Sequence, residues 1–260
     1  MKHAAPTPRR YRALARDALF HSTNWIAALI VTYAVMLLFF CSGYLTRLLC
    51  TCLTLFYPIS PAVYGMLYLV LYFLLSPLLV GLLYYYTDLY RAAHGEGAAY
   101  VPPAVIFSPY SSLRTVVRAW GQITLVLTVC ALIPLSLLPF FRAVRMFSSE
   151  FAGSLTAVLL ILGGVIAFLA ALFLGARLTP FLFLSADRPE LSLLDAVRRT
   201  WRIGADCALT GVLLQLGLIV TTLLSLFLTA GILFFVYVLP IAVFTYIGFC
   251  HELSRRCDLD

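Results

Sequence analysis

The sequence predicts an all-α membrane protein, a polytopic bundle of about six transmembrane helices with two short interfacial amphipathic helices. Of its 260 residues, 63% are hydrophobic and 11% are charged, and the mean hydropathy is +0.99. Soluble domains are about 45–50% apolar and about 25% charged, so a water-soluble fold of this composition would lack the polar surface to cover itself. The apolar residues also fall into runs of about 20, the length at which a helix crosses the hydrocarbon core. We therefore expect one transmembrane domain, residues 1–260, and no sizeable soluble domain.

The first half of the chain contains three candidate spans. A basic leader, residues 1–23, precedes the first apolar run at 25–45. This run is longer than the core of a signal peptide and lacks an obvious small-residue cleavage site, so we expect it to remain as the first span. The second span is expected at 63–86, with a kink at Pro77, and the third at 119–141.

The second half contains three more candidate spans. The fourth, 154–184, is long enough to tilt or break, and Pro180 is the expected break. From Cys207 to Cys250 the chain has no Asp, Glu, Lys or Arg, and this stretch is too long for one crossing. Two spans joined by a tight turn at Thr229-Ala230-Gly231 are therefore predicted. These spans and the cytoplasmic tail after them are 207–228, 231–251 and 252–260.

The distribution of arginines predicts the orientation in the cell membrane, because cytoplasmic loops carry an excess of basic residues. With a cytoplasmic N-terminus, most arginines fall in the leader, in the segments after spans two and four, and in the tail. The outer segments then hold only Arg47, Arg142 and Arg145. Both termini are therefore expected in the cytoplasm. The net charge of +7 lies at the ends of apolar runs, which favours anionic headgroups as partners over nucleic acid.

Two cytoplasmic segments, 111–120 and 192–201, have the pattern of short amphipathic helices. Each begins with serine, a good N-cap, and places Leu and Val on one face with Arg and Trp suited to the headgroup layer. Identical residues recur at one fixed offset: Ser111/Ser192, Leu113/Leu194, Val116/Val197, Arg118/Arg199 and Trp120/Trp201. The matches indicate either a parallel internal repeat of span, surface helix and span, or the common demands on any interfacial helix.

The chain from about Thr179 onward carries a family resemblance. It contains the motif Pro180-Phe181-Leu182-Phe183-Leu184-Ser185-Ala186-Asp187, then the surface helix from Ser192 to Gly204, then Pro240 and Tyr246. This resembles the uncharacterised bacterial integral membrane family named domain of unknown function 975. Arg202-Ile203-Gly204 stands where that family would have Met-Lys-Gly, and Ile241 stands where an aromatic residue would follow the proline. The resemblance implies an architecture and no particular chemistry.

Polar residues within or beside the spans are few, and they are the candidate site residues: Arg177, Asp88, Glu252, Gln122 and Gln215. An arginine inside a span costs about 2.5–3.5 kcal/mol on insertion scales, which makes it a functional candidate. Arg177 would otherwise snorkel to the headgroups or pair with Asp88 or Glu252, at the inner ends of spans two and six. Gln122 and Gln215 are typical of interhelical hydrogen bonds.

No catalytic, cofactor-binding or metal motif is apparent. Cys50-Thr51-Cys52 lacks a second pair at zinc spacing, and His251-Glu252 lacks the second histidine of a zinc-protease motif. The spans contain no paired carboxylates or histidine cluster, so neither enzyme activity nor a cofactor is expected. The sequence favours a non-catalytic scaffold or accessory factor for other membrane components. The alternative is a small-solute or lipid transporter with a polar site at the interface of an internal repeat.

Overall fold

The computed structural model describes residues 8–20, 24–56, 60–96, 100–148, 155–178, 180–187, 191–229 and 237–257. Nearly all of these residues are helical, and no β-strand occurs among them. In this part of the chain, five helices are long and apolar enough to cross a membrane, and the shorter Leu239–Leu253 is also apolar. The all-α prediction is confirmed, and the architecture is that of a multi-pass membrane protein.

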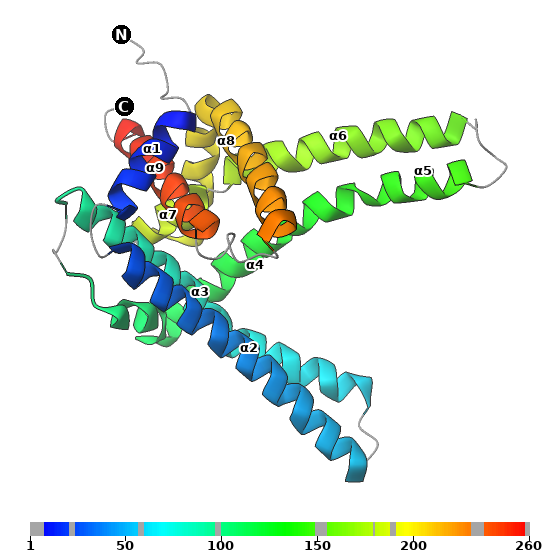
Figure 1. Ribbon diagram of the computed structural model, residues 1–260, viewed down its shortest axis with the longest axis horizontal. Coiled ribbons are helices and arrows are strands. Elements are labelled where there is room, and N and C mark those ends of the chain that lie inside the picture. The colour runs from blue at the N-terminus through cyan, green and yellow to red at the C-terminus, as the bar shows by residue number, and fades with distance from the viewer. Residues whose placement is uncertain are drawn as a thin grey trace. The chain divides into compact units, whose positions relative to one another are not determined.

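The described elements follow one another along the chain as shown in Figure 1. They are α1 (Pro8–Phe20), α2 (Asn24–Phe56), α3 (Pro61–Ala93), the 3-10 helix η1 (Pro103–Tyr110), α4 (Leu113–Ser136), α5 (Leu138–Ser148), α6 (Leu155–Leu178), α7 (Pro180–Asp187), α8 (Leu193–Thr229) and α9 (Leu239–Cys257). They fall into two compact units. Unit 1 contains Met1–Tyr11, Thr124–Gly231 and Phe249–Asp260, and unit 2 contains Arg12–Ile123 and Ile232–Gly248.

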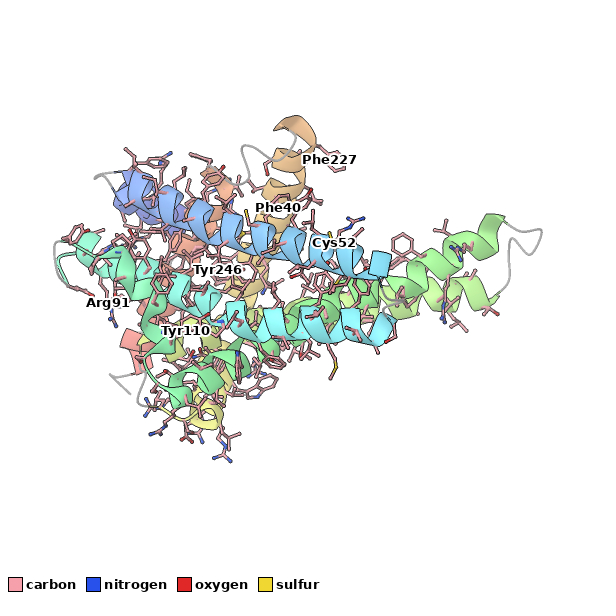
Figure 2. The ribbon with its side chains drawn as sticks, turned by 90° about the horizontal axis from the view of Figure 1, so that it is seen from below. Phe40, Cys52, Arg91, Tyr110, Phe227 and Tyr246 are labelled. Atoms are coloured by element: carbon pink, nitrogen blue, oxygen red, sulfur yellow. The ribbon has the colours of Figure 1, made fainter. Side chains whose placement is uncertain are left out.

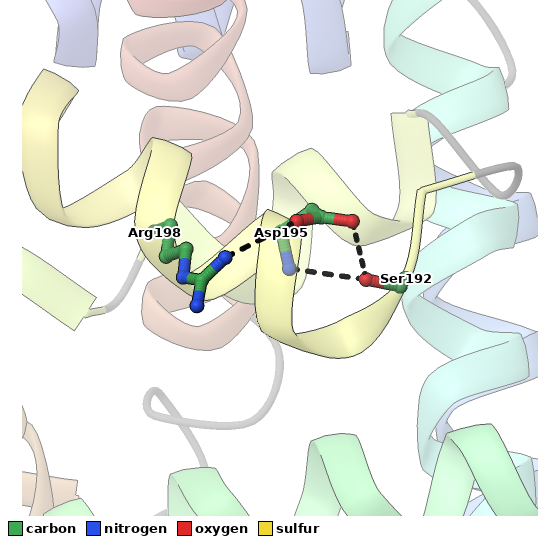
Figure 3. Close-up of polar contacts among 3 residues, drawn as sticks. All are labelled: Ser192, Asp195 and Arg198. Atoms are coloured by element: carbon green, nitrogen blue, oxygen red, sulfur yellow. Dashed lines mark hydrogen bonds and ion pairs between the residues drawn. The ribbon is translucent and has the colours of Figure 1, made fainter.

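The two segments predicted as separate surface helices are instead the first turns of α4 and α8. In α8 the Ser192 hydroxyl accepts a hydrogen bond from the Asp195 N–H (3.2 Å) and donates one to the Asp195 carboxylate (2.6 Å), and Arg198 lies 4.0 Å from that carboxylate (Figure 3). Ser112 caps α4 in the same way through the Thr115 N–H. Each helix then runs into its span because no proline follows the cap to stop it.

Pro180 is the first residue of α7, and Thr179 before it lies outside the described residues, so the predicted break of the fourth span stays a prediction. Pro139 lies in the first turn of α5, where a proline is favourable because its missing N–H would have no helical partner there. Pro77 differs, since it lies within α3 and the helix continues through it. Thr229 of the predicted turn at 229–231 is the last described residue of α8, and the other two residues lie outside the described residues, so the turn stays a prediction.

The helices α2 and α3 of unit 2 form a hairpin and are longer than the predicted spans (Figure 1). Each has 33 residues, about 50 Å of helix at 1.5 Å per residue, against a hydrocarbon core of about 30 Å. Polar residues do not end these helices, because hydroxyl side chains bond to carbonyls of their own helix. Such bonds run from Thr32, Ser42, Thr46, Thr51, Thr54 and Thr87, and in other spans from Thr128, Ser136, Thr221, Ser225 and Thr245. Satisfied hydroxyls are what a lipid environment requires.

Unit 2 is organised around α3. Its Tyr86 hydroxyl bonds Thr32 of α2 (2.8 Å), and its ring meets Phe244 of α9 edge to face, with 5.6 Å between centroids. On another side, η1 packs so closely that a Cβ at Gly81 would lie 1.8 Å from the Ile106 carbonyl oxygen. The Trp120 indole of α4 donates to the Phe73 carbonyl of α3 (2.6 Å). Thus α2, η1, α4 and α9 each have a specific contact with α3.

Unit 1 is organised around α6, which packs against α5 and α8. Gly164 of α6 lies under the Phe140 ring of α5, where a Cβ would come within 2.9 Å of the ring. Towards the other end of α6, Ala176 lies against Gly211 of α8. A Cβ on Gly211 would stand 3.2 Å from the Ala176 Cβ. Small residues at these positions let the helices approach closely, as in many membrane bundles.

Candidate functional site

Arg177, in the last turn of α6, is held against the first turns of α8. Its Nη2 donates a hydrogen bond to the Trp201 carbonyl oxygen (2.8 Å), and its guanidinium lies over the Trp201 ring, 3.9 Å from the centroid. The guanidinium carbon also lies 5.7 Å from the centroid of the Phe173 ring, which is on the same helix as Arg177. The close approach of α6 and α8 depends on Gly204 of α8, because a Cβ at this position would lie 2.9 Å from the Arg177 carbonyl oxygen. The intramembrane arginine is therefore a contact between two helices.

The same end of the α6–α8 pair is strongly basic. Trp201 is 43% exposed, and the neighbouring Arg198, Arg199 and Arg202 of α8 are also exposed. The Nε–H of Arg177 is buried and has no hydrogen-bond partner among the residues that the structure describes. A buried N–H of this kind calls for an acceptor, and an anion is the strongest acceptor for a guanidinium.

The two glutamines also lie at helix contacts. Gln122 is fully buried in α4 and hydrogen-bonds the Tyr84 side chain of α3. The Gln215 amide of α8 lies against Gly175 of α6. A Cβ on Gly175 would stand 3.2 Å from the Gln215 Nε2. Buried amides in such places act as packing contacts between transmembrane helices.

The two carboxylates have separate surroundings. Asp88 lies 3.8 Å from Arg91, one turn further along α3. Glu252 is half-buried on α9. The contacts described for Arg177 are those with Trp201 and Phe173. Its pairing with Asp88 or Glu252 stays a prediction.

A groove of about 440 Å³ lies between the C-terminal part of α4 and α6. Its lining residues are Leu132, Leu135, Ser136, Ala167, Ala170, Ala171 and Leu174. The Ser136 hydroxyl donates to the Ile133 carbonyl of its own helix (2.6 Å), so the lining offers little hydrogen bonding. The volume is within the range of small-molecule pockets, about 300–1,000 Å³. The sequence does not predict this groove, and its one signal for it is the alanine spacing on one face of α6.

Within the described residues, no group of three or more His, Cys, Asp or Glu side chains is placed to hold a metal ion. Comparison of the chain with protein-family models, with curated proteins and with solved structures gave no match. The function is therefore argued from the geometry of the chain alone.

The contact between Arg177 and Trp201 is expected to appear as a coupling energy. In a double-mutant cycle with Arg177→Gln and Trp201→Leu, we expect about 0.5–2 kcal/mol of interaction, the range of cation–π pairs. The free energy of unfolding in detergent micelles is the measurement. Arg177→Gln combined with Trp120→Leu is the matched control and should be additive. Additivity for Trp201 as well would contradict the stacking contact.

Proposed function

We propose that this chain is a non-catalytic scaffold or accessory factor, which contacts other membrane proteins through the apolar faces of its helices. The observation that carries the proposal is the use of Arg177, a charged residue within a span, as a contact with Trp201. Gln122 and Gln215 lie at helix contacts as well. Polar groups that hold helices together leave the outward faces for partners.

The α2–α3 hairpin offers exposed apolar faces for such partners. On α2, Phe40 is 73% exposed, and on α3, Met66 is 71% exposed. Side chains of this kind project along the hairpin, with Phe40 and Cys52 labelled in Figure 2. Large side chains exposed over so much of a transmembrane hairpin contact either lipid or another helix.

We further propose that the protein lies in the cell membrane with both termini in the cytoplasm. The support is the clustering of arginines at the starts of α4 and α8, where cytoplasmic anionic headgroups would meet them. Membership in the bacterial family named domain of unknown function 975 is part of the same proposal. It is supported by the residues from Pro180 to Gly204, and it adds no activity.

The proposed orientation predicts opposite labelling at the two ends of α3. In a background without native cysteines, Glu96→Cys should react with a membrane-impermeant maleimide only after the cells are opened. Ser60→Cys should react in intact cells, because it begins α3 on the outer side. The reverse pattern would show that the arginine distribution does not set the orientation of this chain.

A transporter of lipid or small solutes is the second candidate. The buried Arg177 Nε–H without a described partner and the groove between α4 and α6 favour it. We rank it lower because the described groove lining is almost wholly apolar, while a solute pathway requires polar groups.

Photo-cross-linking in intact membranes tests the scaffold proposal. A benzoylphenylalanine at Phe40 or Met66 should form one discrete adduct with a second membrane protein. The same probe at Leu172, which is buried in α6, is the matched control and should form none. Adducts only with lipid at both exposed positions would contradict a scaffold that uses this hairpin.

A further inference from the structure

The α4–α6 groove has an apolar part and a charged end on a single face of α6. Its lining residues Ala167, Ala170, Ala171 and Leu174 follow the spacing of one helix face. Arg177 continues that face, three residues after Leu174. The groove therefore lies one turn before Arg177 on the same face of α6, and the Arg177 guanidinium stacks on Trp201.

The charged end is suited to a phosphate. Arg177 uses Nη2 for the Trp201 carbonyl, while its buried Nε–H has no partner among the described residues. Arg198, Arg199 and Arg202 are exposed on the adjoining turns of α8. Guanidinium groups form strong, charge-assisted hydrogen bonds with phosphate oxygens. The positive charge at this end thus complements an anionic headgroup.

The apolar part is suited to an acyl chain. The groove is lined by leucine and alanine side chains, and its one hydroxyl, on Ser136, already donates to Ile133. A polar solute would lose its hydrogen bonds there without replacement. A helix from a second copy of the chain would also fit an apolar groove, but the apolar stretch from Cys207 to Cys250 has no Asp or Glu that could pair with Arg177.

We propose that this groove and the arginine end of α6 form one binding site for an anionic phospholipid. The acyl chain lies between α4 and α6, and the phosphate accepts hydrogen bonds at Arg177. The site goes beyond the scaffold role and does not depend on it, since a scaffold and a transporter could each hold a structural lipid.

The fluorescence of Trp201 can report lipid binding directly, because its ring lies beside the Arg177 guanidinium. The chain has three tryptophans, so the double variant Trp25→Phe/Trp120→Phe leaves Trp201 as the single fluorophore. The protein is reconstituted in phosphatidylcholine vesicles that contain a small fraction of phosphatidylglycerol brominated on its acyl chains. A parallel sample carries the same fraction of brominated phosphatidylcholine. We expect Trp201 to be quenched at a roughly tenfold or more lower mole fraction of the anionic lipid, the scale of one charge-assisted hydrogen bond.

Two adjacent residues of α6 provide a matched pair of variants. Ala170→Phe fills the groove, whereas Leu169→Phe adds a ring at a position that is 58% exposed and outside the lining. Ala170→Phe should abolish the preference for phosphatidylglycerol, and Leu169→Phe should keep it. Arg177→Gln should abolish the preference as well, and Arg177→Lys should retain part of it. Arg177 also contacts α8, so Arg177→Gln could fail to fold. In that case the comparison of Ala170→Phe with Leu169→Phe still tests the proposal.

Three results would overturn the proposal. One is equal quenching of Trp201 by the two brominated lipids. Another is a preference for phosphatidylglycerol that survives Ala170→Phe as fully as Leu169→Phe. The last is efficient disulfide formation between two copies through Ala170→Cys, which would make a second copy the occupant of the groove.

Discussion

Gly81→Ala is expected to displace η1 from α3 and to cause the largest loss of stability among single alanine substitutions at glycine. The new Cβ would lie 1.8 Å from the Ile106 carbonyl oxygen and 2.6 Å from its carbonyl carbon. Backbone atoms cannot rotate away as a side chain can, so the whole 3-10 helix must shift. Overpacking of this kind costs about 1–3 kcal/mol and sometimes more.

The shift should also break polar contacts that hold η1 and α4 on α3. The Tyr110 hydroxyl donates to the Leu74 carbonyl, and the Trp120 indole donates to the Phe73 carbonyl. The free energy of unfolding in micelles measures the cost. Gly65→Ala is the control on the same helix, because no atom lies within 4 Å of its Cβ position. Gly65→Ala should leave the free energy of unfolding unchanged or raise it by up to about 1 kcal/mol, because alanine favours the helix. Equal stability of the two variants would contradict the packing of η1.

Gly204→Val is expected to have the second-largest effect, by forcing α8 away from α6. A Cβ at this position would lie 2.9 Å from the Arg177 carbonyl oxygen and 3.2 Å from its Cα, and valine adds two further methyl groups. The stack of Arg177 on Trp201 would be lost with the approach of the two helices. We expect a loss of about 1–3 kcal/mol in the free energy of unfolding.

The variant in which Trp201 is the only tryptophan gives a second signal for Gly204→Val. Its emission should change as the guanidinium leaves the ring. Gly163→Val on α6 is the matched control, since its Cβ position has no atom within 4 Å. Loss of stability in both variants to the same extent would mean that β-branching in the helix, and not the contact with Arg177, sets the cost.

Composition and the length of the apolar runs predicted the helical, membrane-spanning character of the chain. They did so because the polarity of each run acts locally. The contacts of Arg177 could not be predicted in this way. Trp201 lies 24 residues away along the chain, and nothing in the spacing distinguishes it from other aromatic residues. Trp201 was instead assigned to the headgroup layer.

The groove and the lengths of the helices were missed for a related reason. In a membrane protein, apolar residues face both lipid and neighbouring helices, so Ala170 in a groove and Leu169 beside it look alike in the sequence. The arginines in the first turns of α4 and α8 interrupt the apolar pattern, and for that reason the sequence predicts separate helices there. Helical hydrogen bonding continues regardless of that pattern, as the uninterrupted helices α4 and α8 show.

The central claim is that polar groups within the spans serve helix contacts and do not line a water-filled path. Gln215 tests it most directly, because it lies within the apolar span Ala208–Ser225 and against Gly175 of α6. In a background without native cysteines, Gln215→Cys is exposed to membrane-impermeant thiol reagents from each side, with Glu96→Cys as the accessible control. We predict labelling of position 96 and none of position 215 from either side. Labelling of position 215 that a small solute blocks would contradict the claim and make the chain a transporter.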